Sequence, residues 1–257
     1  MTAHFYRIAK KVKPTGVGVT DSYYVELSAV AKNNGPNAPY CIPNEFIAGE
    51  IGRFLGLPIP PMGLMAVTGT SGPPDIWFAS LDFNFTGVNL PPADRDACVK
   101  QLPSLSTGLI IFDTLLINCD RHRGNLSLDT SVTPHRLSVF DHSHALFGFT
   151  DGQGEQRLTD LRDKLGISGG VFTHGNRHCL LDKLDTFSHF QYWVDRIKCL
   201  PDFFIDDIFD RVENLGITAT EITVGKDFIK HRRSNIVQIL DAHQAEFKGI
   251  TQWGALR

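Results

Sequence analysis

The segments that decide the fold are NCDRHRGN (118–125) and RLSVFDHS (136–143). Asp120 begins a polar loop, and Asn125 follows five residues later. A turn signal then leads to a strand over 136–140, with Asp141 at the end of that strand. A hairpin of this size can bring Asn125 and Asp141 to neighbouring strand ends. The pattern therefore predicts one site built from Asp120, Asn125 and Asp141.

These three side chains suit phosphoryl transfer from ATP. That reaction needs a carboxylate that orients the attacking hydroxyl or accepts its proton. It also needs Mg²⁺, a hard cation that binds one or two carboxylates together with phosphate oxygens. Asp120 fits the first role, and Asn125 and Asp141 fit the second. The step from Asp120 to Asn125 equals the step between base and metal ligand in kinase catalytic loops, so we expect ATP and Mg²⁺ as cofactors.

The residues before this loop predict a buried helix. Apolar side chains occupy both of its sides: Leu105, Leu109, Phe112 and Leu116 on one, and Ile111 and Leu115 on the other, with Gly108. Further helices are expected at about 187–199, 203–215 and 225–247. The basic run 231–233 in the last of them is expected on a solvated face.

The N-terminal part predicts strands and one helix. Strands are expected at 23–27 and 76–79. Gly16 and Gly18 lie in a short loop before the first strand and are candidate contacts to the ATP. A helix is expected to start at an Asn44 cap, with Glu45 in its first turn, and to stop at Gly56. Strands and helices in separate blocks indicate an α+β fold. We expect an N-lobe over 1–80 and a mainly helical C-lobe over 81–257, joined by a linker at 82–92.

Two motifs carry a resemblance to a known family. The sequence Asp-Arg-His-x-x-Asn, followed by a strand and Asp-His, resembles the HipA-like kinases and is also similar to the phosphatidylinositol kinases. NEFIA (44–48) with LGLPIP (55–60) resembles the HipA-like helix that ends in Leu-Gly-Leu-Pro-x-Pro. The resemblance covers roughly residues 20–148. It implies a two-lobed protein-kinase-like fold and ATP-dependent Ser/Thr protein kinase activity, with autophosphorylation or toxin–antitoxin function as options.

The resemblance also implies roles for single residues. His122 would support the catalytic loop or the charge of the transition state, and the linker after Ala79 would contact adenine. Related kinases carry a lysine on the strand before the helix, where it pairs with the helix glutamate and the ATP phosphates. Glu26 occupies the expected position of that lysine. Lys32, paired with Glu45, is the candidate replacement, with Lys10, Lys11 or Lys13 next.

Two other functions stay open. Glu26 in place of lysine favours a pseudokinase, a non-catalytic nucleotide-binding module that regulates a partner. A lipid kinase is the third option, because the phosphoinositide enzymes share Asp-Arg-His, but the sequence contains no basic amphipathic membrane helix. The partner is expected to be a protein substrate or a regulatory protein of unknown identity.

The composition argues against several classes of protein. The 257 residues carry a net charge of −3, which argues against DNA binding by this chain. No apolar run reaches the ~18 residues of a membrane helix, so we expect no membrane contact. Five scattered cysteines without a CxxC pair favour a reducing cytoplasm. A zinc site needs three or four converging ligands; we expect His122, His142 and His144, near Cys119, to line the site or form hydrogen bonds instead.

Overall fold

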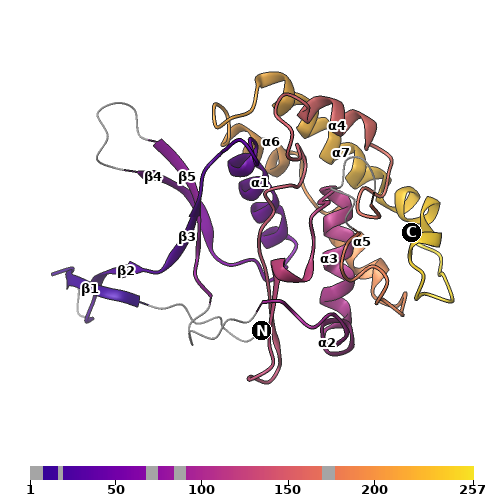
Figure 1. Cartoon of the computed structure of the whole chain (residues 1–257), viewed down its shortest axis with the longest axis horizontal. Coiled ribbons are helices and arrows are strands. Elements are labelled where there is room, and N and C mark those ends of the chain that lie inside the picture. Colours follow the sequence, from indigo (N-terminus) through magenta and orange to yellow (C-terminus); the bar gives the residue numbers. More distant parts are fainter. Residues whose placement is uncertain (1–7, 17–19, 68–74, 84–90, 170–176) are drawn as a thin grey trace.

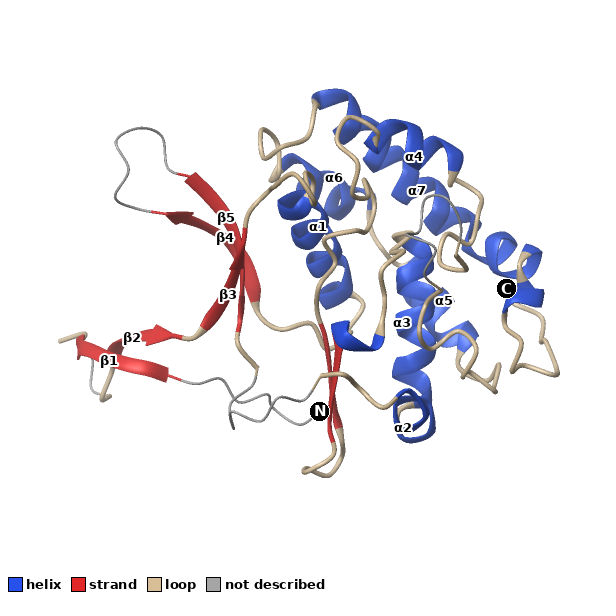
Figure 2. Cartoon of the chain, in the orientation of Figure 1, coloured by secondary structure: helices blue, strands red, loops and turns tan. Residues whose placement is uncertain are grey.

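The computed structural model of the chain describes residues 8–16, 20–67, 75–83, 91–169 and 177–257. In these residues the N-terminal strands lie to one side of a mainly helical body, as Figures 1 and 2 show. The fold is therefore α+β, with a small strand-rich part and a larger helical part, as the sequence predicts. The boundary at residues 80 and 81 stays a prediction.

Within the described residues, five strands form the strand-rich part. They are β1 (Ile8–Pro14), β2 (Tyr23–Leu27), β3 (Ala29–Lys32), β4 (Met62–Val67) and β5 (Asp75–Leu81). β1 and β2 pair as an antiparallel hairpin, and β3, β5 and β4 form a separate antiparallel sheet in that order. The hairpin projects away from the rest of the molecule in Figure 1. Strands β2 and β5 confirm the two strands that were expected here.

Helix α1 (Cys41–Phe54) lies between the three-stranded sheet and α6. It begins before the expected start, with Tyr40 as the preceding residue, so the prediction that Asn44 caps the helix is wrong. Pro43 does not interrupt it, since the first helical turn needs no backbone N–H donor. The buried Asn44 side chain instead donates to the carbonyls of Ser143 and Gly148 and accepts from the N–H of Phe147. It therefore joins α1 to the segment after Asp141.

Six further helices of the part of the chain that the structure describes form the rest of the helical body. They are α2 (Arg95–Gln101), α3 (Pro103–Leu115), α4 (Gly154–Asp160), α5 (Phe190–Lys198), α6 (Asp202–Asp210) and α7 (Ala219–Ala242). The expected helices near 187–199, 203–215 and 225–247 correspond to α5, α6 and α7, although α7 starts earlier. α3 is buried from Ser106 to Leu115, as predicted, and contacts both α5 and α7. A Cβ on Gly108 would lie within 2.5 Å of the Trp193 ring, so glycine allows α3 and α5 to pack.

The prediction that the basic run 231–233 is solvated is wrong for Arg232. Its guanidinium is fully buried and donates to five backbone carbonyls, those of Thr114, Leu115, Leu161, Arg162 and Lys164. Free carbonyls at helix ends need such donors when they are buried. Arg232 therefore links α7 to the ends of α3 and α4.

The expected hairpin is present in the helical part. β6 (Leu126–Asp129) pairs antiparallel with β7 (Arg136–Val139), and Leu126 faces Val139. Short 3₁₀ turns, η1 (Arg123–Asn125) and η2 (Gln244–Glu246), precede β6 and follow α7. Among the described residues, no helix is both long enough and apolar enough to cross a membrane.

Candidate active site

The β6–β7 hairpin brings Asn125 and Asp141 to the same end of the two strands. Asn125 directly precedes β6, and the N–H of Phe140 donates to the Asn125 carbonyl at 3.4 Å. The amide Nδ2 of Asn125 donates to the carbonyl of Asp120 at 2.9 Å. Because Nδ2 is engaged in this hydrogen bond, the other polar atom of the amide, Oδ1, is the one suited to bind a cation.

Asp141 sits in the left-handed region of backbone space, with φ at 59°. Such a conformation is costly for a non-glycine residue and is held only by its surroundings. Its carboxylate Oδ1 accepts from the hydroxyl of Ser143 at 2.8 Å and lies 2.8 Å from Lys32 Nζ. The surroundings of Asp141 thus fix both its backbone and its carboxylate.

Lys32 is the last residue of β3, and its ammonium group contacts two carboxylates. Nζ lies 2.5 Å from Glu45 Oε1 on α1 and 2.8 Å from Asp141 Oδ1 after β7. Glu45 also accepts a hydrogen bond from the backbone of His142. Three elements that are distant in the sequence therefore meet at one ammonium group, and the expected Lys32–Glu45 pair is present.

The charges in this triad shift one another. Burial alone would lower the pKa of Lys32, but Glu45 and Asp141 outweigh it and hold that pKa above the usual range. Burial alone would raise the pKa of Asp141, but Lys32 and the Ser143 hydroxyl bring it well below the usual range. Full burial raises the pKa of Glu45, and Lys32 limits that rise. At neutral pH Lys32 is a cation held against an ionised Asp141.

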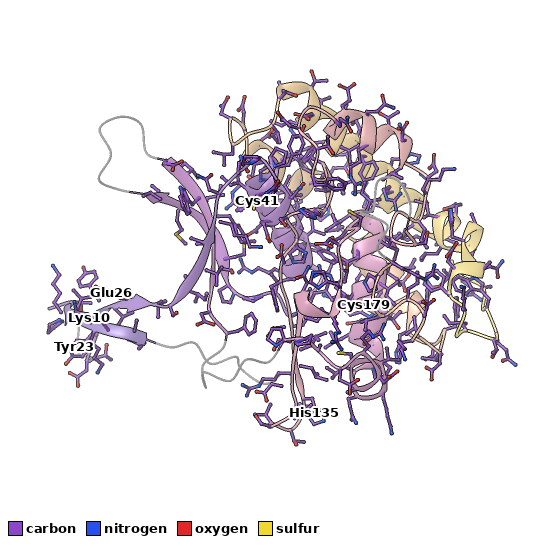
Figure 3. All side chains as sticks on the ribbon, in the orientation of Figure 1. Lys10, Tyr23, Glu26, Cys41, His135 and Cys179 are labelled. Atoms are coloured by element: carbon purple, nitrogen blue, oxygen red, sulfur yellow. The ribbon has the colours of Figure 1, made fainter. Side chains whose placement is uncertain are left out.

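The position assigned to Glu26 is wrong. Glu26 lies on β2 in the projecting hairpin, where its carboxylate is 3.8 Å from Lys10 Nζ and both side chains are exposed. Figure 3 shows Lys10 and Glu26 together on that hairpin, far from Cys41 at the start of α1. The strand that precedes α1 and faces Glu45 is β3, and its lysine is Lys32. The sequence pattern puts the expected lysine position one strand too early, because β2 and β3 are separated by a single residue, Ser28.

Asp120 and His122 stand on the loop after α3. Asp120 Oδ2 lies 3.5 Å from His144 Nδ1, and 24% of the Asp120 side chain is exposed. His122 accepts a hydrogen bond at Nδ1 from the N–H of Gly124 at 3.0 Å, which closes the η1 turn. A Cβ on Gly124 would lie 2.8 Å from that ring. His122 therefore supports the loop, and the Asp120 carboxylate is partly exposed beside His144.

A cavity of about 310 Å³ lies between the three-stranded sheet and Asp141. Apolar side chains form most of its wall: Val30, Ile59, Pro60, Met62, Phe78, Leu81, Phe83, Val139 and Phe140. Lys32, Glu45 and Asp141 line it as well. Leu81 to Phe83 and Pro91 bring the expected linker to the wall, whereas 84–90 lies outside the described residues. An apolar slot beside a cation and carboxylates can hold a planar base with an anionic tail.

Gly16 and the lysines of the β1–β2 hairpin are not among the described residues that line this cavity. Gly16 has φ at 71° and open space around it, in the segment after β1. Gly18 lies outside the described residues. Lys11 and Lys13 lie over the rings of Tyr23 and Tyr24 on the projecting hairpin. Among the described lysines, the one that lines the cavity is Lys32.

The oxygen ligands at the hairpin end fit Mg²⁺. Asn125 and Asp141 offer an amide oxygen and a carboxylate, and the Lys32 ammonium already occupies a cation position 2.8 Å from Asp141 Oδ1. A zinc site would need three or four converging nitrogen, sulfur or carboxylate ligands. No group of three or more His, Cys, Asp or Glu side chains converges within the described residues, and the Nδ1 atoms of His122 and His142 face Gly124 and Arg121.

Sequence reasoning missed two residues beneath the site. The sequence pattern assigns no role to Asp113, in the middle of the apolar helix, or to Arg121 beyond its place in the Asp-Arg-His motif. Both are fully buried, with Arg121 Nε 2.8 Å from Asp113 Oδ2. A carboxylate in the middle of a helix that is apolar on all sides was the available signal, because such a group is retained only when it is paired.

Comparison with known proteins shows the fold. No protein-family model matches the chain, and no curated protein matches it. A crystal structure of the Helicobacter pylori proinflammatory kinase CtkA is similar over 87% of this chain and 94% of that chain, with a TM-score of 0.55 and 18% sequence identity. An identity this low carries information about architecture alone. The chain therefore has a two-lobed kinase-like fold.

Proposed function

We propose that this chain is an ATP- and Mg²⁺-dependent kinase of HipA-like type that transfers the γ-phosphoryl group of ATP to a serine or threonine hydroxyl of a protein. The observation that carries the proposal is the contact of Lys32 with both Glu45 and Asp141 at the wall of the cavity. A cation between a helix carboxylate and a carboxylate at a strand end is the arrangement that phosphoryl-transfer enzymes use to hold ATP phosphates and Mg²⁺.

Each residue has a role in this proposal. The apolar wall holds adenine, and Lys32 turns from Asp141 to the phosphates of the nucleotide. Asn125 and Asp141 hold Mg²⁺, which neutralises charge on the phosphates when it is bound. Asp120 orients the attacking hydroxyl and accepts its proton, and His122 keeps the loop in place. The acceptor is a protein, either a separate substrate or the chain itself, in a reducing compartment such as the cytoplasm.

The pseudokinase alternative has lost its main support. It depended on glutamate at the position of the phosphate-binding lysine, and Glu26 lies instead on the projecting hairpin beside Lys10. Lys32 supplies the cation that was thought to be missing. We therefore favour a catalytic protein over a non-catalytic binding module.

The test is incubation with γ-labelled ATP and Mg²⁺, with the chain alone, with cell extract proteins and with phosphoinositide vesicles. The proposal predicts label on serine or threonine of the chain or of another protein, and loss of that label in Asp141→Ala. Label only in the lipid fraction would favour a lipid kinase. Binding of Mg²⁺–ATP in a thermal-shift titration without any label would favour the pseudokinase.

A further inference from the structure

A buried ionic network joins α3 to the proposed catalytic loop, residues 118–125. Its centre is Asp113, which is fully buried in α3 and accepts hydrogen bonds from three side chains. Arg121 donates from Nε at 2.8 Å and from Nη2 at 3.2 Å, Asn118 donates from Nδ2 at 2.9 Å, and His178 Nε2 lies at 3.1 Å. Burial would raise the pKa of Asp113, but Arg121 and His178 bring it well below the usual range. Asp113 is therefore an ionised carboxylate inside the protein.

Arg121 connects this carboxylate to both strand ends of the β6–β7 hairpin. Its Nη1 donates to the carbonyl of Phe140 at 2.6 Å and to that of Asn125 at 3.3 Å. Asn125 is one proposed metal ligand, and Phe140 directly precedes the other, Asp141. A planar guanidinium with five donors in fixed directions holds such a pair of carbonyls at a set separation. The two oxygens of the Asp113 carboxylate accept from Nε and Nη2 and thereby fix the plane of that guanidinium.

His178 is the third member of the network and comes from a different part of the chain. Its Nδ1 accepts from the N–H of Leu180 at 3.1 Å, so the proton of the neutral ring is on Nε2, which donates to Asp113. The neighbouring N–H of Cys179 donates to the carbonyl of Arg121 at 2.9 Å. The segment 178–180 therefore contacts Asp113 of α3 through a side chain and Arg121 of the loop through its backbone.

We infer that Asp113, Arg121 and His178 are positioning residues that set the separation of the two metal ligands, Asn125 and Asp141. The inference rests on the proposed function and names what holds its metal site in place. Asp113 and His178 are fully buried, so neither can touch a substrate. They act through Arg121, in the way that outer hydrogen-bond partners of metal ligands tune affinity.

The experiment compares His178→Leu with His178→Gln in the full chain. Leucine removes the donor to Asp113, whereas the amide Nε2 of glutamine can replace the imidazole N–H. The probe is Mn²⁺, titrated with a fixed excess of ADP and followed by electron paramagnetic resonance, alongside ADP binding without metal. We expect Mn²⁺ affinity to fall about 10- to 100-fold in His178→Leu, to recover in His178→Gln, and metal-free ADP affinity to stay at the parent value in both.

A structural control separates positioning from loss of stability. Phe190→Leu alters the aromatic cluster with Phe187, Phe247 and Trp253 and should lower the melting temperature without changing Mn²⁺ affinity. Asn118→Ala removes one donor to Asp113 and also the acceptor of the Asp120 N–H. It leaves Arg121 and His178 on Asp113, so it should weaken Mn²⁺ binding less than His178→Leu, and it keeps the test valid if the leucine variant does not fold.

The outcomes distinguish this inference from the proposed function. Parent-like Mn²⁺ affinity in His178→Leu and Asn118→Ala would overturn the positioning role and leave the kinase proposal intact. The positioning role would also be overturned if His178→Gln bound Mn²⁺ as weakly as His178→Leu, or if Phe190→Leu weakened Mn²⁺ binding equally. A parent chain that binds no Mn²⁺ in the presence of ADP would overturn both.

Discussion

The ammonium group of Lys32, at the end of β3, lies 2.8 Å from Oδ1 of Asp141, beyond the end of β7. Asp141 Oδ1 also accepts from the Ser143 hydroxyl. One oxygen of the proposed metal ligand thus already faces a cation. Nucleotide phosphates would draw Lys32 away from Asp141 and free that oxygen, so metal and nucleotide should bind more tightly together than separately.

The first prediction concerns Lys32 in catalysis. Lys32→Met should lower phosphate transfer from ATP by about 10²- to 10³-fold, because a preorganised cation at the phosphates is lost. Lys230→Met is the matched control. Lys230 is also 27% exposed and is ion-paired, with Asp206 Oδ1 at 2.6 Å, but it lies on α7. Transfer rates from initial velocities check this, and equal rates in the parent and Lys32→Met would send the role to Lys10, Lys11 or Lys13.

The second prediction concerns metal binding without nucleotide. The same Lys32→Met variant should bind Mn²⁺ alone about tenfold more tightly than the parent, since the competing ammonium has left Asp141; linkage energies of this kind are commonly 1–3 kcal/mol. Isothermal titration calorimetry at low ionic strength measures the two dissociation constants. Adding Asp141→Asn should cancel the gain. A nucleotide-free affinity equal to that of the parent would mean that Lys32 and the metal do not compete.

The third prediction separates chemistry from binding at Asp120. Asp120→Asn should reduce phosphoryl transfer by about 10²- to 10⁴-fold, the usual contribution of a positioned general base. The dissociation constant for Mg²⁺–ADP should stay unchanged, because the Asp120 backbone carbonyl, not its carboxylate, holds the Asn125 amide. Single-turnover rates and a fluorescence titration measure the two quantities. A loss of Mg²⁺–ADP affinity as large as the loss of transfer rate would assign Asp120 to metal binding.

The fourth prediction concerns acid stability and His142. Burial, with the nearby Arg121 guanidinium, lowers the pKa of His142 to about 3. The unfolded ring has a pKa of about 6.5, so between these values the unfolded state binds more protons than the folded state. Stability should therefore fall as the pH drops below about 6.5, by up to about 1.4 kcal/mol per pH unit for this group.

His142→Asn tests that dependence, because its Oδ1 can replace the ring Nδ1 that accepts from Arg121. The free energy of unfolding from urea titrations at pH 7 and pH 5 should change less in this variant than in the parent. His135→Asn, at the tip of the β6–β7 hairpin in Figure 3, should keep the parent's change. A parent slope retained in His142→Asn would assign the acid sensitivity to other groups.

The fifth prediction concerns the support of the site. In Gly108→Ala the new methyl group would overlap the Trp193 ring, so α3 and α5 must move apart. We expect a loss of about 1–3 kcal/mol in the free energy of unfolding, typical of overpacked cores. Trp193→Leu should restore part of that loss when combined with Gly108→Ala, although it is destabilising alone. Thermal or urea unfolding measures these free energies. If the losses of the two single variants simply add in the double variant, the predicted clash is contradicted.

The sequence by itself determined the local features of this protein. Apolar periodicity located α3, and runs of β-forming residues located β2 and β5. The spacing of Asp120, Asn125 and Asp141 predicted a hairpin that brings two oxygen ligands together, and the structure has that hairpin. These features depend on neighbours in the chain, which a sequence displays directly.

Only the tertiary structure decided which lysine faces the site. Glu26 and Lys32 lie on consecutive strands, and either strand can precede α1 when judged by local pattern alone. The ion pair of Lys32 with Glu45 and Asp141 forms because β3, α1 and β7 meet in space. The burial of Arg121 and Arg232 was hidden for the same reason. A charged side chain is tolerated inside a protein only where distant carboxylates or carbonyls converge on it, and no local pattern records that convergence.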